Sequence, residues 1–148
     1  MRHLNVLLAA GTLVLGGCAN NSAFQIVPFP NQTARLDDSA KCRIYIVRDT
    51  IVGAAYTTEI LDGDNIVGSV EANTYLCWER QPGQTVISGR GAMTPTILAK
   101  QIKLDAEPGK VYYIREHMWF TGALRLVSEK QGEKAVRKCH PPSFRDQP

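Results

Sequence analysis

The residues best suited to bind a metal ion are two histidines and their neighbours. His117 follows Glu116, and His140 follows Cys139. Imidazole, thiolate and carboxylate are all zinc ligands, but a structural zinc site needs four of them at recognisable spacing. Adjacent residues of a strand point to opposite faces, so Glu116 and His117 cannot serve one ion from a strand. The pattern therefore predicts no metal and no other cofactor.

A second polar cluster has the residue types of a calcium loop. Asp62, Asp64 and Asn65 surround Gly63, but the twelfth loop position, which should be glutamate in an EF-hand, is Asn73. Glycine between acidic residues is instead typical of a hairpin turn, because glycine readily adopts positive φ. The chain also lacks the motifs of serine hydrolases, zinc proteases and phosphate-binding loops. We therefore expect a protein without catalytic residues that is not an enzyme.

Cys18 is the residue with the clearest chemical signal. An uncharged run from Leu4 to Gly17 follows Arg2 and ends in small residues directly before this cysteine. The run is shorter than the ~20 apolar residues of a membrane-spanning helix, and residues 1–17 have the pattern of a secretory signal peptide. The four residues that end in Cys18 resemble the lipobox of bacterial lipoproteins. This resemblance implies cleavage between Gly17 and Cys18 and acylation of the cysteine.

The expected lipid anchor indicates where the protein resides. Stable attachment needs more than one acyl chain, at ~0.8 kcal/mol for each buried methylene, and a triacylated cysteine meets that need. Ala19, rather than aspartate, follows Cys18, which resembles the pattern of lipoproteins sent to the outer membrane. We expect a protein of the bacterial cell envelope, lipid-anchored in the outer membrane and facing the periplasm. Residues 18–40, in which apolar side chains are sparse, should be its flexible tether.

Three further cysteines, Cys42, Cys77 and Cys139, would enter an oxidising compartment on export. Three thiols allow three different single disulfides, and the sequence alone cannot choose among them. We favour Cys42–Cys139, because this bond would tie the first strand of the domain to its C-terminal segment. Cys77, beside Trp78 in a strand, would then be a buried free thiol.

The chain from residue 41 onwards has the pattern of an all-β fold. Strand-like segments rich in β-branched and aromatic residues occupy 42–49, 55–70, 74–89, 96–119 and 122–127. The three longest contain turns at Gly63, Pro82 and Gly109 and are predicted hairpins, and a helix should follow Ser128. We predict an antiparallel β-sandwich of about seven to eight strands with a short C-terminal helix. The domain should span residues 41–139, and residues 140–148 should form a disordered tail.

A family resemblance is carried by RIYIVRD, ILDGDNIVGSVEANTYLCWERQPGQTVIS and LDAEPGKVYYI, in this order. These segments resemble the small bacterial lipoproteins labelled domain of unknown function 2846, over residues 42–139. That family is similar in turn to the PEGA-type β-sandwiches of bacterial envelope proteins. The resemblance implies the fold and the location. It implies no catalytic residue, because the matching positions are turn and strand residues.

One surface is a candidate for binding another molecule. Met118, Trp119 and Phe120 are consecutive, so a strand cannot bury all three on one face. Aromatic residues and methionine are enriched at protein interfaces. Arg90 and Met93 lie in a second loop and could join the same patch.

Two functions are compatible with these patterns. The net charge of +3 is too small to indicate nucleic acid as a partner. The leading hypothesis is a lipid-anchored interaction module that binds another envelope component through the predicted patch. The alternative is a periplasmic carrier of a small apolar ligand, which would need an internal cavity on the order of several hundred Å³.

Overall fold

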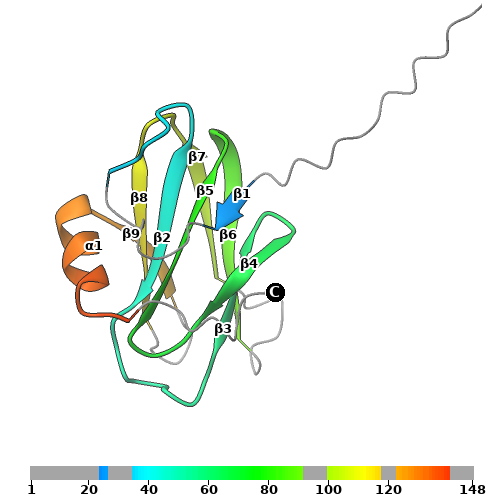
Figure 1. The fold of residues 1–148 in the computed structure, drawn as a ribbon. Coiled ribbons are helices and arrows are strands. Elements are labelled where there is room, and N and C mark those ends of the chain that lie inside the picture. The colour runs from blue at the N-terminus through cyan, green and yellow to red at the C-terminus, as the bar shows by residue number, and fades with distance from the viewer. Residues whose placement is uncertain (1–23, 27–34, 92–99, 118–122, 141–148) are drawn as a thin grey trace, which may run out of the picture.

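The computed structural model describes residues 24–26, 35–91, 100–117 and 123–140. These residues form two β-sheets packed face to face and one short helix (Figure 1). The strands are β1 (Phe24–Ile26), β2 (Cys42–Arg48), β3 (Thr58–Asp62), β4 (Asn65–Val70), β5 (Thr74–Arg80), β6 (Gly83–Gly91), β7 (Lys100–Ala106), β8 (Val111–His117) and β9 (Ala123–Val127), and the helix is α1 (Glu129–Val136). The predicted all-β sandwich with a C-terminal helix is confirmed, with nine strands among the described residues.

The strand order differs between the two sheets. The first sheet has the order β1-β5-β2-β8-β9, and the second has the order β4-β3-β6-β7. Neighbouring strands are antiparallel, except that β2 and β8 are parallel. A parallel pair needs a long connection, and here the strands of the second sheet and β5 lie between β2 and β8 in the chain.

One of the three predicted hairpins pairs its own strands, and two do not. β3 and β4 are antiparallel neighbours, and Gly63 in their turn has a φ of 61°. The turns at Pro82 and Gly109 pass the chain between the sheets, because β5 and β8 belong to the first sheet and β6 and β7 to the second. The hairpin prediction was wrong at both places. A turn signal shows where the chain reverses but not which strand the next strand pairs with.

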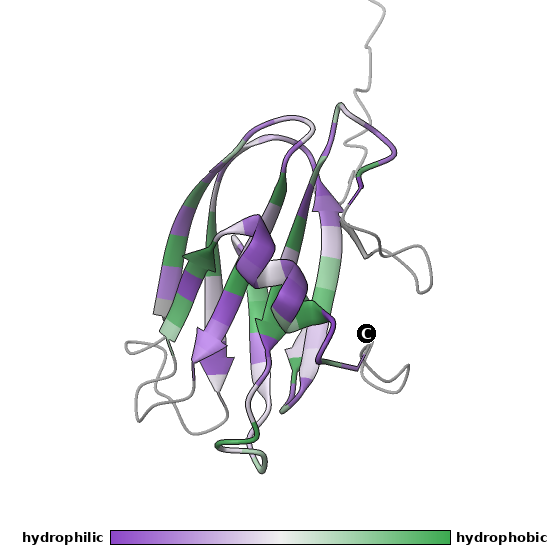
Figure 2. Ribbon diagram, turned by 90° about the vertical axis from the view of Figure 1, so that its left-hand side faces the viewer, coloured by the Kyte–Doolittle hydropathy of each residue, from purple (hydrophilic) through white to green (hydrophobic). Residues whose placement is uncertain are grey.

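The main core lies between the two sheets. Ile44, Trp78 and Ile114 of the first sheet pack with Ile60 and Ile87 of the second, and all five are fully buried. Complete burial of such a side chain contributes ~1.5–3 kcal/mol. Apolar and polar residues alternate along several strands (Figure 2), as expected for strands with one face in the core. This packing fixes the directions in which the strand ends, and therefore the loops, point.

Helix α1 covers the outer face of the first sheet, so that β2 is buried on both faces. Tyr45 and Tyr113 stack beneath the helix with ring centroids 5.0 Å apart, and Ala135 packs against this cluster. Gly132 permits the close approach, because a Cβ there would lie 2.1 Å from Cγ of Tyr113. The helix begins after its N-cap Ser128, as the sequence predicts.

The predicted flexible tether, residues 18–40, contains a strand. β1 lies at the edge of the first sheet and runs antiparallel to β5, with Phe24 opposite Arg80. The prediction was wrong for this part because strand addition to a sheet edge uses backbone hydrogen bonds, which a sparse apolar pattern does not reveal. The domain therefore includes a strand at least fifteen positions before its expected start at residue 41.

Candidate functional site

The loop that joins β2 to β3 carries large apolar side chains in solvent. Ile51 is 70% exposed, Val52 is 55% exposed and Tyr56 is 45% exposed. In the part of the chain that the structure describes, five large hydrophobic residues are exposed, and three of them are in this loop. We call Ile51, Val52 and Tyr56 the apolar loop; it projects at the lower end of the sandwich (Figures 1 and 2). Gathered apolar groups mark interaction sites, whereas scattered ones are normal.

Arg48 holds the backbone of this loop from the inside. Its side chain is fully buried, and its guanidinium donates to the carbonyl oxygens of Gly53 at 2.5 Å and Tyr56 at 2.6 Å. A longer hydrogen bond, of 3.4 Å, reaches the carbonyl oxygen of Val52. Hydrogen bonds to a charged group contribute ~1.5–3 kcal/mol each. The loop backbone is therefore fixed, while its apolar side chains remain in water.

A buried polar pair lies at the same end of the sandwich. Thr58, the first residue of β3, donates its hydroxyl to Oε1 of Glu116 in β8 at 2.6 Å. In the described part of the chain, Oε2 of Glu116 and Nε of Arg48 are buried without a hydrogen-bond partner. Burial raises the pKa of the Glu116 carboxyl, and the Thr58 hydroxyl and the Arg48 charge oppose part of that rise. The pair ties the second sheet to the first beneath the apolar loop.

These buried polar groups give the end of the sandwich its shape rather than a reactive site. Arg48, Thr58 and Glu116 are each at least nine-tenths buried, so a substrate in solvent does not reach them. The chemistry that this end offers to another molecule is apolar contact from Ile51 and Val52 and the phenol of Tyr56. These exposed groups offer apolar surface and one hydroxyl for contact with another molecule.

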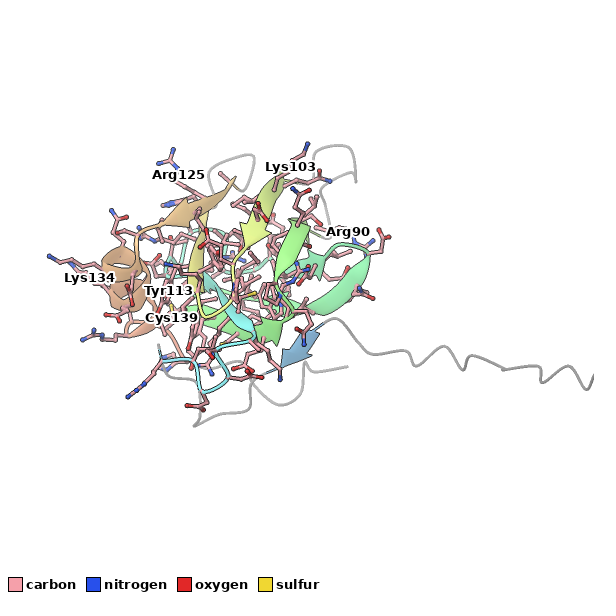
Figure 3. All side chains as sticks on the ribbon, turned by 90° about the horizontal axis from the view of Figure 1, so that it is seen from above. Arg90, Lys103, Tyr113, Arg125, Lys134 and Cys139 are labelled. Carbon is pink, nitrogen blue, oxygen red and sulfur yellow. The ribbon has the colours of Figure 1, made fainter. Side chains whose placement is uncertain are left out.

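The predicted interaction patch is placed only in part. Four of its residues lie outside the described residues: Met93, Met118, Trp119 and Phe120. Arg90 is exposed and forms an ion pair with Glu59 (Figure 3). Gly91, at the end of β6, pairs with Thr58, and Thr58 in turn donates to Glu116 near the end of β8. The strand ends next to both predicted segments therefore lie at the end of the sandwich that carries the apolar loop.

The sequence pattern does not indicate an exposed apolar loop between β2 and β3. The sequence predicts that a strand begins at Ala55, whereas β3 begins at Thr58. Two available signals were Asp49, directly after β2, and Gly53 within the apolar run. Apolar residues between two strands are normally assigned to the interior, and the structure shows that these are outside.

The predicted disulfide between Cys42 and Cys139 is not formed, and Cys42, Cys77 and Cys139 are free thiols. Cys42 lies in the core between the sheets, whereas Cys139 packs with Tyr113 in the cluster beneath helix α1 (Figure 3). The prediction was wrong because the two thiols lie on opposite faces of the first sheet. Cys77 is a buried free thiol, and burial raises its pKa to about 12. Cys18, the predicted acylation site, lies outside the described residues.

Asp62 has a structural role that the turn motif did not reveal. Its buried carboxylate accepts a hydrogen bond from the indole N–H of Trp78 at 3.0 Å and one from the Arg80 guanidinium at 2.9 Å. The Thr85 hydroxyl also donates to it. Asp64, in contrast, is exposed in the turn. The carboxylate of Asp62 is therefore engaged in joining strands.

The two candidate histidines are not brought together with other metal ligands. Among the described residues, no group of three or more His, Cys, Asp and Glu side chains is placed to hold a metal ion. His140 donates its backbone N–H to the carbonyl oxygen of Asn73 at 2.8 Å and forms a β-bridge with Thr74. The first residue of the predicted tail is therefore held on the sheet, and residues 141–148 lie outside the described residues.

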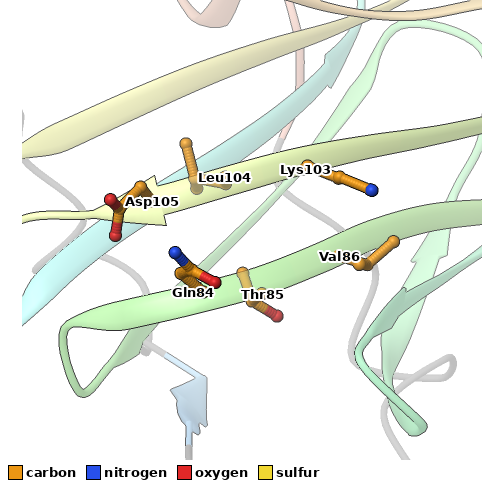
Figure 4. A pocket seen from close by; sticks show the side chains of 6 residues that line it. All are labelled: Gln84, Thr85, Val86, Lys103, Leu104 and Asp105. Carbon is orange, nitrogen blue, oxygen red and sulfur yellow. The ribbon is translucent and has the colours of Figure 1, made fainter.

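A hollow of about 440 Å³ lies along β6 and β7, at the edge of the second sheet. It is lined by Gln84, Thr85, Val86, Lys103, Leu104 and Asp105 (Figure 4). Four of the six lining residues are polar or charged, and Gln84, Lys103 and Asp105 are exposed. The hollow is open to solvent and lies at the edge of the second sheet.

Comparison with known proteins finds a weak resemblance to an uncharacterized protein. A protein of Haemophilus influenzae described as uncharacterized is 27% identical over 111 residues, which cover 72% of this chain and 64% of the relative. The matched part of the chain thus spans less than two thirds of that relative's length. No family model matches the chain, and no solved structure matches it. Within the described residues, no helix is both long and apolar enough to cross a membrane.

Proposed function

We propose that this protein is a lipid-anchored module of the bacterial cell envelope that binds another envelope component and catalyses no reaction. The observation that carries the proposal is the apolar loop, whose backbone is fixed by Arg48 while Ile51, Val52 and Tyr56 are exposed. A loop of this kind loses little conformational freedom when it binds, because its backbone is already ordered. A surface preorganised in this way is suited to recognition.

The proposed anchor is acylated Cys18 in the outer membrane, with the domain in the periplasm. It is supported by the uncharged run that ends at Gly17, by the small residues before Cys18 and by Ala19 after it. The resemblance to small lipoproteins of domain of unknown function 2846 agrees with the same location. Removal of residues 1–17 would make Cys18 the N-terminal residue of the mature protein.

The alternative function, carriage of a small apolar ligand, has less support. The side chains between the sheets pack into one buried cluster that includes Trp78, Ile44 and Ile60. The hollow along β6 and β7 offers mainly polar side chains at a sheet edge. A carrier site would instead bury most of an apolar ligand against apolar walls.

The anchor can be tested by metabolic labelling with a radioactive fatty acid in cells that produce the full chain. The native chain should carry label, lose residues 1–17 and sediment with the outer membrane. Cys18→Ser should be unlabelled and uncut, and Cys139→Ser, which changes a cysteine outside the proposed motif, should behave as the native chain does. Normal processing and labelling of Cys18→Ser would refute the proposed anchor.

The binding surface can be tested with two variants matched for exposure. Tyr56 is 45% exposed in the apolar loop, and Ile66 is 46% exposed in β4, away from that loop. Tyr56→Asp should abolish the association with the partner in cells, whereas Ile66→Asp should preserve it. Equal effects of the two substitutions would show that the apolar loop is not the binding surface.

A further inference from the structure

The pairing of β1 shortens the distance between the proposed anchor and the folded domain. Cys18 is six positions before Phe24, which is already paired to the sheet. Six residues span at most about 22 Å when they are fully extended. The acylated end of the chain is therefore tethered closely to the point where β1 joins the first sheet.

That point lies at the opposite end of the sandwich from the apolar loop. Phe24 pairs with Arg80, the last residue of β5, whereas Arg48, which precedes the loop, pairs with Thr74, the first residue of β5. These residues are the two ends of the seven-residue strand β5, and the six steps between them correspond to about 20 Å at the rise of a β-strand. Glu107 lies at the same end of the sandwich as Arg80. Gly109, two residues after Glu107, donates its backbone N–H to the carbonyl oxygen of Lys41. Lys41 directly precedes the first residue of β2, which pairs with Arg80.

The direction of β1 decides how the domain is oriented on its anchor. β1 is antiparallel to β5, so β1 begins at the Arg80 end of the sandwich and runs from there towards the level of Trp78. To place the apolar loop on the anchoring bilayer, the tether would have to reverse direction and then run straight along the whole sandwich. A reversal uses several residues, and those that remain do not span about 20 Å plus the projection of the loop.

The loop also lacks the charges of a membrane-binding segment. Residues 49–57 contain no lysine or arginine, and Asp49 is engaged by Arg115 through contacts of 2.6 and 2.7 Å. Segments that lie on anionic bilayers combine apolar groups with lysine and arginine. A neutral surface with Ile51, Val52 and a phenol is instead typical of protein interfaces, in which tyrosine is enriched.

We propose that the sandwich stands on its anchor with Arg80 and Glu107 towards the bilayer and the apolar loop pointing away from it. In this orientation, the apolar loop binds a protein in the periplasm, with Ile51 and Val52 in an apolar groove and the Tyr56 hydroxyl at its polar rim. The inference rests on the proposed function, because it requires acylated Cys18. It adds the direction of the binding surface and the kind of partner that the surface fits.

The orientation can be measured on the acylated full-length protein in phosphatidylcholine vesicles. A fluorescent amino acid replaces Tyr56 in one variant and Glu107 in another, and the vesicles contain lipids with a spin label on the headgroup. We expect quenching at position 107 to exceed quenching at position 56 by at least about threefold, because short-range quenching follows the separation of about 20 Å between the two ends. Equal quenching, or stronger quenching at position 56, would overturn the orientation.

The partner can be identified by photo-crosslinking in living cells. Benzoylphenylalanine replaces Tyr56, and the control carries it at Ile66, which has the same exposure. We expect a protein adduct from position 56 that is absent from position 66 and is lost when Val52→Asp is added. A lipid adduct, an adduct of two copies of this chain, no adduct, or an adduct unaffected by Val52→Asp would each overturn the proposed partner.

A control separates failure of this inference from failure of the proposed function. Acylation of Cys18 is verified by mass before either probe is used, and Val52→Asp is checked for a native melting temperature. A chain that is not acylated would refute the proposed anchor, and the orientation with it. An acylated chain with the opposite quenching pattern would refute the orientation alone.

Discussion

The indole N–H of Trp78 donates to Oδ2 of Asp62 at 3.0 Å and so links the two sheets through a buried polar contact. Arg80 of the first sheet and Thr85 of the second donate to Oδ1 of the same carboxylate. Asp62→Ala should therefore lower the free energy of unfolding by about 3 kcal/mol, since buried donors lose a charged acceptor. Urea denaturation followed by tryptophan fluorescence measures this loss.

The control for this prediction is Asp64→Ala, two positions away in the turn. Asp64 is exposed, so its replacement should change stability by no more than about 0.5 kcal/mol. Equal effects at positions 62 and 64 would mean that Asp62 matters only as a turn residue.

The contact between Gly132 and Tyr113 should be intolerant of any side chain. Gly132→Ala places a methyl group 2.1 Å from Cγ of Tyr113, so the helix must move off the sheet. We expect a loss of at least about 2 kcal/mol, typical of overpacking, together with a weaker near-ultraviolet circular dichroism signal of the tyrosines. Lys134→Ala, on the exposed side of the same helix, should leave both measurements unchanged.

The buried Glu116 should make stability depend on pH. Burial raises its pKa in the folded protein above the ordinary value of 4.5, so the folded state binds this proton more tightly than the unfolded state. Its contribution to stability is then greatest at low pH and declines as pH rises from 4.5 through the folded pKa. Glu116→Gln should gain stability relative to the native chain over that range, as measured by denaturation at several pH values.

A second variant tests the same pH dependence of stability. Thr58→Val removes the hydroxyl that lowers the pKa of Glu116, so the decline in stability should extend to higher pH. A difference between Glu116→Gln and the native chain that stays constant with pH would contradict the assignment of this titration to Glu116.

The three thiols of the folded domain should be free and unequal in reactivity. Burial raises the pKa of Cys77 to about 12 and that of Cys139 to about 11, and it also raises the pKa of Cys42. A thiol reagent at pH 8 should modify Cys139 slowly, because it is only half-buried, and should leave the two buried thiols intact until denaturant is added. A peptide linked through Cys42 and Cys139 would contradict the structure.

The sequence predicts the fold where the signals are local. Glycine at positions 63 and 109 indicates the turns because both residues have positive φ, and Ser128 indicates the start of the helix. Pairing is not local, so the sequence does not reveal that β5 and β6 belong to different sheets or that β2 and β8 are parallel. The addition of β1 to a sheet edge was hidden for the same reason.

The candidate site is harder to predict than the fold because it breaks the usual rule of burial. Arg48 is a charged residue that is fully buried, and Ile51 is an apolar residue that is largely exposed. Either position, taken alone, would be assigned to the opposite environment. The hydrogen bonds of Arg48 to the loop carbonyls explain why the charged residue is inside and the apolar residue is outside. These bonds join residues that no short motif connects.

In the proposed function, Cys18 becomes the acylated N-terminus of a protein of the cell envelope. The most direct measurement is the mass of the N-terminal peptide of the protein purified from the outer-membrane fraction. We expect a peptide that begins at Cys18 and carries a diacylglyceryl group on its sulfur and a fatty acyl group on its nitrogen. A peptide that still contains Gly17, or an unmodified Cys18, would contradict it.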